Sequence, residues 1–227
     1  EMETAPWRFW RFWSKRSKYR PRVLAEDFEA IRALYQNQGF LDVEVEENTR
    51  DFASSGILSI RVSDGGRFQF GEIKIKPTVL FTTEEILEGT MIFKGKPYSP
   101  SLLNKEKNRI KRMYGDQGYL DAVVEVVRES KPDNNRIDLT FAIDEGKPFK
   151  VNSIRILGNE KTKSVVLLRE LVLAPGDDFD LTKMETSQSR LQNTNFFEKV
   201  EISDEPTLKS YSGSPRRDLV VEVTEKT

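Results

Sequence analysis

The chain of 227 residues carries 36 basic and 37 acidic residues, a formal net charge of −1, and contains no histidine and no cysteine. Such an even mixture of charges disfavours a nucleic-acid surface or a polybasic membrane anchor, because each requires one sign to accumulate. The absence of histidine and cysteine argues against zinc sites, serine-type catalytic triads and cysteine–histidine dyads. The composition therefore predicts a non-enzymatic protein without a metal or other cofactor.

Internal repetition is the main feature of the sequence. Residues 19–42 align without a gap with residues 98–121, at an offset of 79 residues. Residues 68–75 match residues 149–156 at an offset of 81 residues, which adds a more divergent third copy. A repeat of about 80 residues predicts a tandem array of one small unit, and a hydrophobic share of 37% suits several small cores better than one large core.

An aromatic run at residues 7–13 precedes the first recognisable element. If this run is helical, Trp10 and Trp13 share one face of the helix. Trp7, Trp10 and Trp13 then either pack against the rest of the first unit or form a surface for a partner or a second copy of the chain.

A long amphipathic helix is predicted in each unit from apolar residues at helical spacing. It begins near Pro21 in the first copy and near Pro100 in the second, where the missing N–H of proline costs little. Gly39 and Gly118 stand where a left-handed C-cap is needed, and Asn195 takes that place in the third copy. Although residues 115–118 formally match the Gly-x-x-Gly loop of RNA-binding KH domains, their surroundings are not basic, so we expect no nucleic-acid partner.

Alternating apolar residues predict two strands after each long helix. These pairs of strands fall at residues 41–45 and 58–62, 122–126 and 137–143, and 200–202 and 219–223. Further strands are expected at 70–75 and 151–156, each followed by a short helix. Thr82 and Glu85 form a capping-box pattern for the first of these helices, and the second is expected over residues 163–173, capped from Thr162.

The predicted order in each unit is strand, helix, helix, strand, strand. Short linkers at residues 64–67 and 144–148 separate the units, so neighbouring units should be close and partly coupled. The expected domains are a partial repeat at residues 1–66, lacking its first strand and most of its first helix, and further repeats at 67–146 and 147–227.

The third copy resembles the POTRA domains of BamA-type outer-membrane assembly factors. The resemblance is carried by residues 149–171, with Gly158 and Asn159, by the helix ending at 189–200 and by the closing strand at 218–226. It implies an α+β fold of tandem βααββ repeats, each with two helices packed on a three-stranded mixed sheet. The last strand is similar to that of the repeat that precedes the membrane barrel, so we expect a C-terminal barrel outside this chain.

The resemblance also implies a function. It suggests a periplasmic, chaperone-like docking arm that binds unfolded outer-membrane proteins and scaffolds accessory lipoproteins. The alternative is an arm for two-partner secretion or another barrel-linked translocation protein with one dedicated client. In the family the second strand of each unit lies at an exposed edge, where unpaired N–H and C=O groups can accept an added strand.

The candidate client-binding strands are therefore residues 42–46, 122–127 and 199–203. The residues singled out in them are Val43, Glu44, Val45, Val123, Val124, Glu125, Val126, Val200, Glu201 and Ile202. The other interpretation of these strands is an ordinary half-buried edge whose exposed charges prevent aggregation. By family analogy, Arg169 and Glu170 are candidates for the surface that faces an accessory lipoprotein, with a solvated helix face as the alternative.

Overall fold

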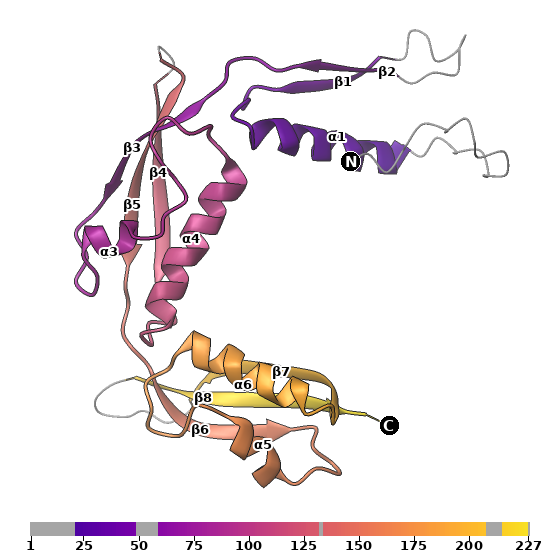
Figure 1. Ribbon diagram of the computed structural model, residues 1–227, viewed down its shortest axis with the longest axis vertical. Coiled ribbons are helices and arrows are strands. Elements are labelled where there is room, and N and C mark those ends of the chain that lie inside the picture. Colours follow the sequence, from indigo (N-terminus) through magenta and orange to yellow (C-terminus); the bar gives the residue numbers. More distant parts are fainter. Residues whose placement is uncertain (1–20, 49–58, 132–133, 208–214, 227) are drawn as a thin grey trace, which may run out of the picture. The chain divides into compact units, whose positions relative to one another are not determined.

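The computed structural model describes residues 21–48, 59–131, 134–207 and 215–226, and these residues form the helices and sheets shown in Figure 1. The aromatic run with Trp7, Trp10 and Trp13 lies outside them. Within the described part of the chain, no helix is long and apolar enough to cross a membrane. The same residues contain no cluster of carboxylates suited to a metal ion.

The first copy contributes one helix and two strands. Helix α1 (Pro21–Gln36) is followed by Gly39 with a φ of +99°, as the C-cap prediction requires. Strand β1 (Glu44–Asn48) pairs antiparallel with β2 (Ser59–Ser63). Strand β2 falls close to the predicted residues 58–62, whereas β1 begins three residues later than the predicted 41–45.

The second copy has the complete predicted order of elements. Its elements are β3 (Gln69–Ile75), α3 (Thr83–Leu87), α4 (Pro100–Gly115), β4 (Val123–Lys131) and β5 (Arg136–Asp144). The strand order is β3-β5-β4, and β3 runs parallel to β5. Thr82 caps α3 in a capping box with Glu85, which confirms the prediction for this helix.

The third copy repeats this arrangement. Its elements are β6 (Lys150–Leu157), α5 (Ser164–Glu170), α6 (Leu181–Asn193), β7 (Phe197–Pro206) and β8 (Arg216–Glu225). Strand β8 lies in the centre, parallel to β6 and antiparallel to β7. The two complete copies confirm the α+β fold of two helices on a three-stranded mixed sheet.

The prediction for helix α5 is wrong in its bounds and its cap. The helix starts after Lys163, which makes no side-chain cap, and it ends before Leu171, whose ψ of 138° is extended. Thr162 is not the cap, because the N-cap position falls on Lys163, one residue later. The backbone N–H of Thr162 donates to Glu225 Oε1 at 2.7 Å, and its carbonyl accepts from Asn159 Nδ2 at 2.9 Å. Contacts from distant residues therefore fix this turn.

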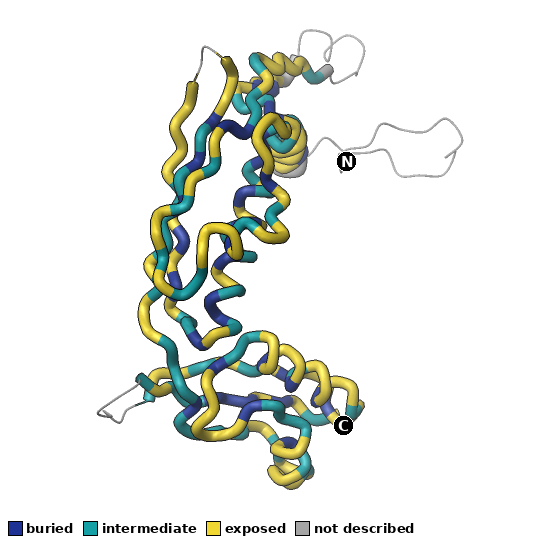
Figure 2. The backbone as a smooth tube through the Cα atoms, turned by 60° about the vertical axis from the view of Figure 1, so that its left-hand side comes forward, coloured by how far each residue is buried: buried dark blue, intermediate teal, exposed yellow. Residues whose placement is uncertain are grey.

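In the two three-stranded sheets, buried and exposed residues alternate along part of each strand, in dark blue and yellow in Figure 2. In the second copy, the buried side chains of the central strand are Ile137, Leu139 and Phe141. In the third, one cluster is formed by Leu167, Leu191, Phe197, Val200, Val221 and Val223. The edge strands thus face a helix on one side and solvent on the other.

The chain divides into two compact units whose boundary crosses the second copy. One unit contains the chain up to Ile75 with Gly89–Glu106 and Val126–Phe141. The other contains Lys76–Glu88, Lys107–Glu125 and Ala142–Thr227.

Within the unit that includes the third copy, Asp121 and Arg217 link residues that are distant in sequence. Arg217 Nη2 contacts both carboxylate oxygens of Asp121, at 2.5 and 2.7 Å. The Arg217 guanidinium also lies 4.2 Å from the centroid of the Phe149 ring. The backbone N–H of Phe149 donates to Gly118 O at 2.9 Å. These contacts fasten the loop after α4 to the third copy.

An aspartate in each central strand satisfies an irregularity in the neighbouring first strand. The β3–β5 register shifts between Phe70 and Ile73, and the β6–β8 register shifts between Val151 and Ile154. Asp138 Oδ1 accepts from Glu72 N at 2.7 Å in the second copy.

The corresponding aspartate of the third copy, Asp218, should make stability depend on pH. Asn152 Nδ2 and Ser153 Oγ each donate to its Oδ1 at 2.7 Å. The Asn152 amide and the Ser153 hydroxyl lower the pKa of Asp218 from its ordinary value of 3.8. Because the folded-state pKa is depressed, the stabilisation is complete above the unfolded pKa and is lost as the pH falls through the folded pKa. Urea denaturation at a series of pH values measures this effect. The difference in free energy of unfolding between wild type and Asp218→Asn should shrink as the pH falls through the folded-state pKa of Asp218. A difference that does not change with pH would contradict this assignment.

Candidate functional site

The candidate site is the set of open sheet edges, where a strand presents backbone N–H and C=O groups to solvent. In the order β3-β5-β4 the edge strands are β3 and β4, and in the order β6-β8-β7 they are β6 and β7. Strands β4 and β7 are the second strands of their repeats, so they occupy the edges that the resemblance implies.

The edges of β3 and β6 are partly covered by the chain itself. Gly95 N donates to Phe70 O at 2.8 Å, and Phe70 N donates to Lys96 O at 2.9 Å. The same pair of bonds recurs in the third copy. Gly176 N donates to Val151 O, and Val151 N donates to Asp177 O, both at 2.8 Å. These loops occupy the start of each first strand, which leaves β4 and β7 as the stronger candidates.

Strand β4 has one apolar face in the core and a second apolar row in solvent. Val124 is buried and Val126 is half-buried, so a client could reach them only through their backbone groups. Val123 and Val127 are each 51% exposed, with Glu125 exposed between them. The candidates of the second copy therefore divide into backbone positions and outward-facing side chains.

Strand β7 presents a different surface. Val200 is buried and Ile202 is half-buried, like Val124 and Val126 of β4. Its outward side chains include the charged Lys199 and Glu201, whose Nζ and Oε1 atoms lie 2.7 Å apart. The Glu201 carboxylate raises the pKa of Lys199 above its ordinary value.

Two glutamines of helix α6 also engage the backbone of β7. Gln188 Nε2 donates to Val200 O at 2.9 Å, and Gln192 Nε2 donates to Glu198 O at 3.3 Å. Two carbonyls of β7 therefore already have side-chain donors, which a client strand would have to displace.

In the first copy, the candidate strand is β1. Val43 directly precedes the strand and Val45 lies within it; both are buried, whereas Glu44 and Glu46 are exposed. An apolar outward row like that of β4 is absent from residues 43–46.

The second candidate surface lies on α5. The side chain of Arg169 is 78% exposed and that of Glu170 is 29% exposed, with 3.8 Å between Arg169 Nε and Glu170 Oε1. Val165 and Leu168 of the same short helix are also exposed. This face is separate from the β4 and β7 edges.

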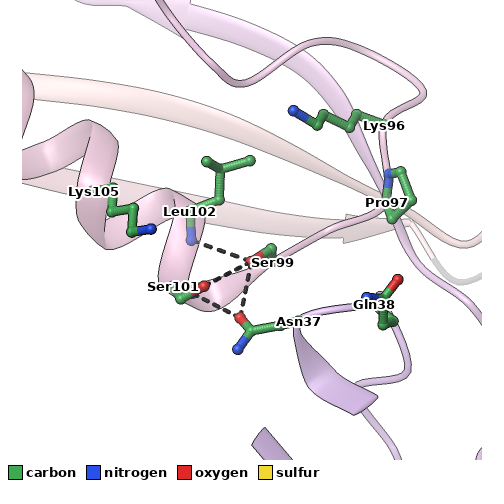
Figure 3. Close-up of a pocket in the computed structure, with 8 residues that line it drawn as sticks. All are labelled: Asn37, Gln38, Lys96, Pro97, Ser99, Ser101, Leu102 and Lys105. Carbon is green, nitrogen blue, oxygen red and sulfur yellow. Dashed lines mark hydrogen bonds between the residues drawn. The ribbon is translucent and has the colours of Figure 1, made fainter. Parts of the chain in front are cut away.

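An open pocket of about 340 Å³ lies in the first compact unit (Figure 3). Its lining residues are Asn37, Gln38, Lys96, Pro97, Ser99, Ser101, Leu102 and Lys105. Asn37 Oδ1 accepts from Ser99 Oγ at 2.9 Å and from Ser101 N at 3.0 Å, while Leu102 N donates to Ser99 Oγ at 3.2 Å. These hydrogen bonds connect the segment after α1 to the start of α4. Because the polar groups are paired with one another, we assign the pocket a structural role and not a binding role.

The sequence pattern includes Val127 in the candidate strand 122–127 without distinguishing it, and it does not indicate Gln188 or Gln192 of α6. Val127 lies at the end of the segment considered, and its exposure becomes clear only once β4 is seen to extend to Lys131. Gln188 and Gln192 have no distinguishing pattern on a polar helix face. Their role depends on where α6 lies beside β7.

Comparison with known proteins identifies relatives across most of the chain. The family profile of POTRA, described as surface antigen variable number repeat, matches residues 68–146 and 149–226. The outer membrane protein assembly factor BamA of Neisseria meningitidis serogroup B is 26% identical over 222 residues, covering 96% of this chain and 27% of that protein. BamA of Nitratidesulfovibrio vulgaris is 28% identical over 209 residues, covering 90% of this chain and 26% of that protein.

Solved structures agree in fold. The crystal structure of Haemophilus influenzae BamA POTRA3-5 superposes with a TM-score of 0.71 at 23% identity, covering 92% of this chain and 82% of that chain. The present chain spans about a quarter of the length of the two curated relatives.

Proposed function

This chain belongs to the POTRA family, and from that premise we propose that it is a docking and scaffolding arm of an outer-membrane β-barrel assembly factor. POTRA repeats of this kind are the periplasmic part of an outer-membrane protein. In this proposal residues 1–66 are the rear portion of a further repeat, and the arm is attached to the membrane through a C-terminal barrel outside this chain.

The observation that supports client binding is the open edge of β4. It lies at the border of its sheet and displays Val123, Glu125 and Val127 to solvent. A strand added there would receive regularly spaced backbone hydrogen bonds, which depend little on the sequence of the client. Such an edge suits a receptor for many different unfolded outer-membrane proteins.

We place the contact with accessory lipoproteins on helix α5. Arg169 and Glu170 offer one charge of each sign to a partner, and Val165 and Leu168 add exposed apolar area. A surface of mixed charge and apolar residues resembles the composition of many protein interfaces. Charge reversal at Arg169 is the change that would most directly disturb it.

Peptide binding tests the proposal for β4. Extended peptides with alternating apolar residues should bind the chain weakly, and the affinity should fall less than about fivefold at high salt, since one exposed ion pair contributes only about 0–1 kcal/mol. Proline at Val124 or Val126 should abolish binding, because proline has no N–H and is poorly tolerated in a strand. Fluorescence anisotropy measures the affinity, and circular dichroism checks that each variant is folded.

Alanine at the same positions is the matched control, because it keeps the backbone N–H. A second control leaves the protein unchanged and methylates alternate backbone nitrogens of the peptide. Binding should be lost for one set of nitrogens only, namely those that face β4. Equal binding by the folded proline variants, or by both methylated peptides, would rule out edge pairing.

A further inference from the structure

We infer that β4 is the strand-accepting edge of the two complete repeats, and that Gln188 and Gln192 close the equivalent edge of β7. This inference rests on the proposed function, which requires strand addition but does not say where. It assigns to two glutamines a role in excluding clients.

The bonds from α6 lie at alternate residues of one strand. Phe196 O accepts from Lys226 N directly after β8, and the β7–β8 register shifts between Phe197 and Lys199. Because one extra residue reverses the alternation of carbonyls, Val200 O points away from β8. Glu198 O and Val200 O both accept from helix side chains, and α6 is not part of the sheet. Val200 O is therefore on the edge that an added strand would need, and Glu198 O lies next to it at the bulge.

The second copy lacks this arrangement. Leu191 of α6 aligns with Tyr114 of α4, and both side chains are fully buried. At the same offset Gln188 aligns with Lys111, and Gln192 aligns with Gly115. Glycine has no side chain that could donate, and Lys111 has an amine where Gln188 has an amide. The two glutamines that engage β7 therefore have no amide counterpart at the aligned positions of α4.

At the β7 edge, a client strand competes with the glutamine side chains for the same backbone carbonyls. A client strand pairing with β7 must first break two amide–carbonyl hydrogen bonds, each contributing modestly to stability. Their combined loss should weaken binding at β7 about tenfold relative to an edge without them.

The exposed side chains of β4 define the occupant. Val123 and Val127 favour apolar residues in the facing positions of an added strand. Glu125 and Glu129 are exposed on the same outward row, so lysine or arginine is preferred between the apolar residues. The expected partner is an extended segment in which apolar residues alternate with residues that include a basic one.

The decisive experiment uses the full chain and two matched ten-residue peptides with alternating valines, one with lysine and one with glutamate at the centre. Isothermal titration calorimetry gives the stoichiometry, and backbone amide hydrogen exchange identifies the protected strand. Wild type should bind one lysine peptide and protect β4. The double variant Gln188→Ala with Gln192→Ala should gain a second site and protect β7, whereas the exposed Ser189→Ala on the same helix should not.

A separate variant does not touch the glutamines or the core. Glu125→Lys should reverse the preference from the lysine peptide to the glutamate peptide by about two- to fivefold, the range of exposed ion pairs. Equal protection of β4 and β7 in wild type, or no second site in the folded double variant, would overturn the role assigned to Gln188 and Gln192. If neither strand is protected by any peptide in any variant, strand addition itself is wrong, and the proposed function fails with it.

Discussion

Replacing Leu139 with alanine should lower the free energy of unfolding by about 2–5 kcal/mol, the range for deleting a large buried side chain. Leu139 is 0% exposed in β5, the central strand of the second repeat. The cavity would open in the strand that separates β3 from β4, so the whole sheet loses packing. Urea denaturation followed by circular dichroism gives the change.

Val127→Ala on the same sheet is the control. Its side chain is 51% exposed and lies on the outward face of β4, so its truncation should change the free energy of unfolding by no more than about 0.5 kcal/mol. The same variant should weaken peptide binding, because Val127 belongs to the outward row. Equal destabilisation by both variants would mean that the core lies elsewhere.

The second large effect is expected at Gly158, directly after β6. This residue has a φ of +81°, and a Cβ added there would lie 2.0 Å from Val223 O of the central strand β8. Alanine pays about 1–2 kcal/mol for the left-handed conformation, and displacing a strand backbone adds about 1–3 kcal/mol. Gly158→Ala should therefore destabilise the third repeat by about 2–5 kcal/mol.

Gly176→Ala separates the two causes. Gly176 has a φ of +99° in the same repeat, but an added Cβ would meet nothing within 4 Å. This variant should show only the conformational cost of about 1–2 kcal/mol. Thermal unfolding of both variants gives the comparison, and identical losses would show that the contact with Val223 has no cost.

The elements of this fold could be read from the sequence because local patterns coincide with tertiary demands. Alternating apolar residues predicted the strands of the two complete repeats, since one face of each three-stranded sheet is buried, although β7 extends beyond the predicted residues 200–202. The capping box at Thr82 predicted the start of α3 because its bonds are made within one turn. Such features need no knowledge of distant residues.

Features that depend on distant contacts could not be predicted in this way. Thr162 has the chemistry of a cap, yet Glu225 from the end of β8 takes its N–H. Gly118 was explained as a helix C-cap, and its φ of +87° agrees. The structure adds that a Cβ there would lie 3.2 Å from Phe149 O, so close approach of the next repeat is a second reason for glycine.

The candidate site was predicted only as a class of edge. The sequence treats residues 122–127 and 199–203 alike, because both alternate and both contain an exposed glutamate. They differ in their outward side chains, which are apolar at Val123 and Val127 but charged at Lys199 and Glu201. A second difference lies outside the strands, in Gln188 and Gln192 of α6. Which helix residue reaches which carbonyl follows from packing geometry that no local pattern encodes.

The absence of cysteine from all 227 residues allows the central claim to be tested with single-cysteine variants. Glu125→Cys and Glu201→Cys place one thiol on the exposed face of β4 or β7, and each variant is mixed with an unfolded outer-membrane protein carrying one cysteine in a barrel strand. After mild oxidation, the disulfide-linked product is measured on a non-reducing gel. If β4 is the client-binding edge, Glu125→Cys gives the product and Glu201→Cys remains at background. Equal cross-linking at both positions, or none at Glu125→Cys, would contradict this account.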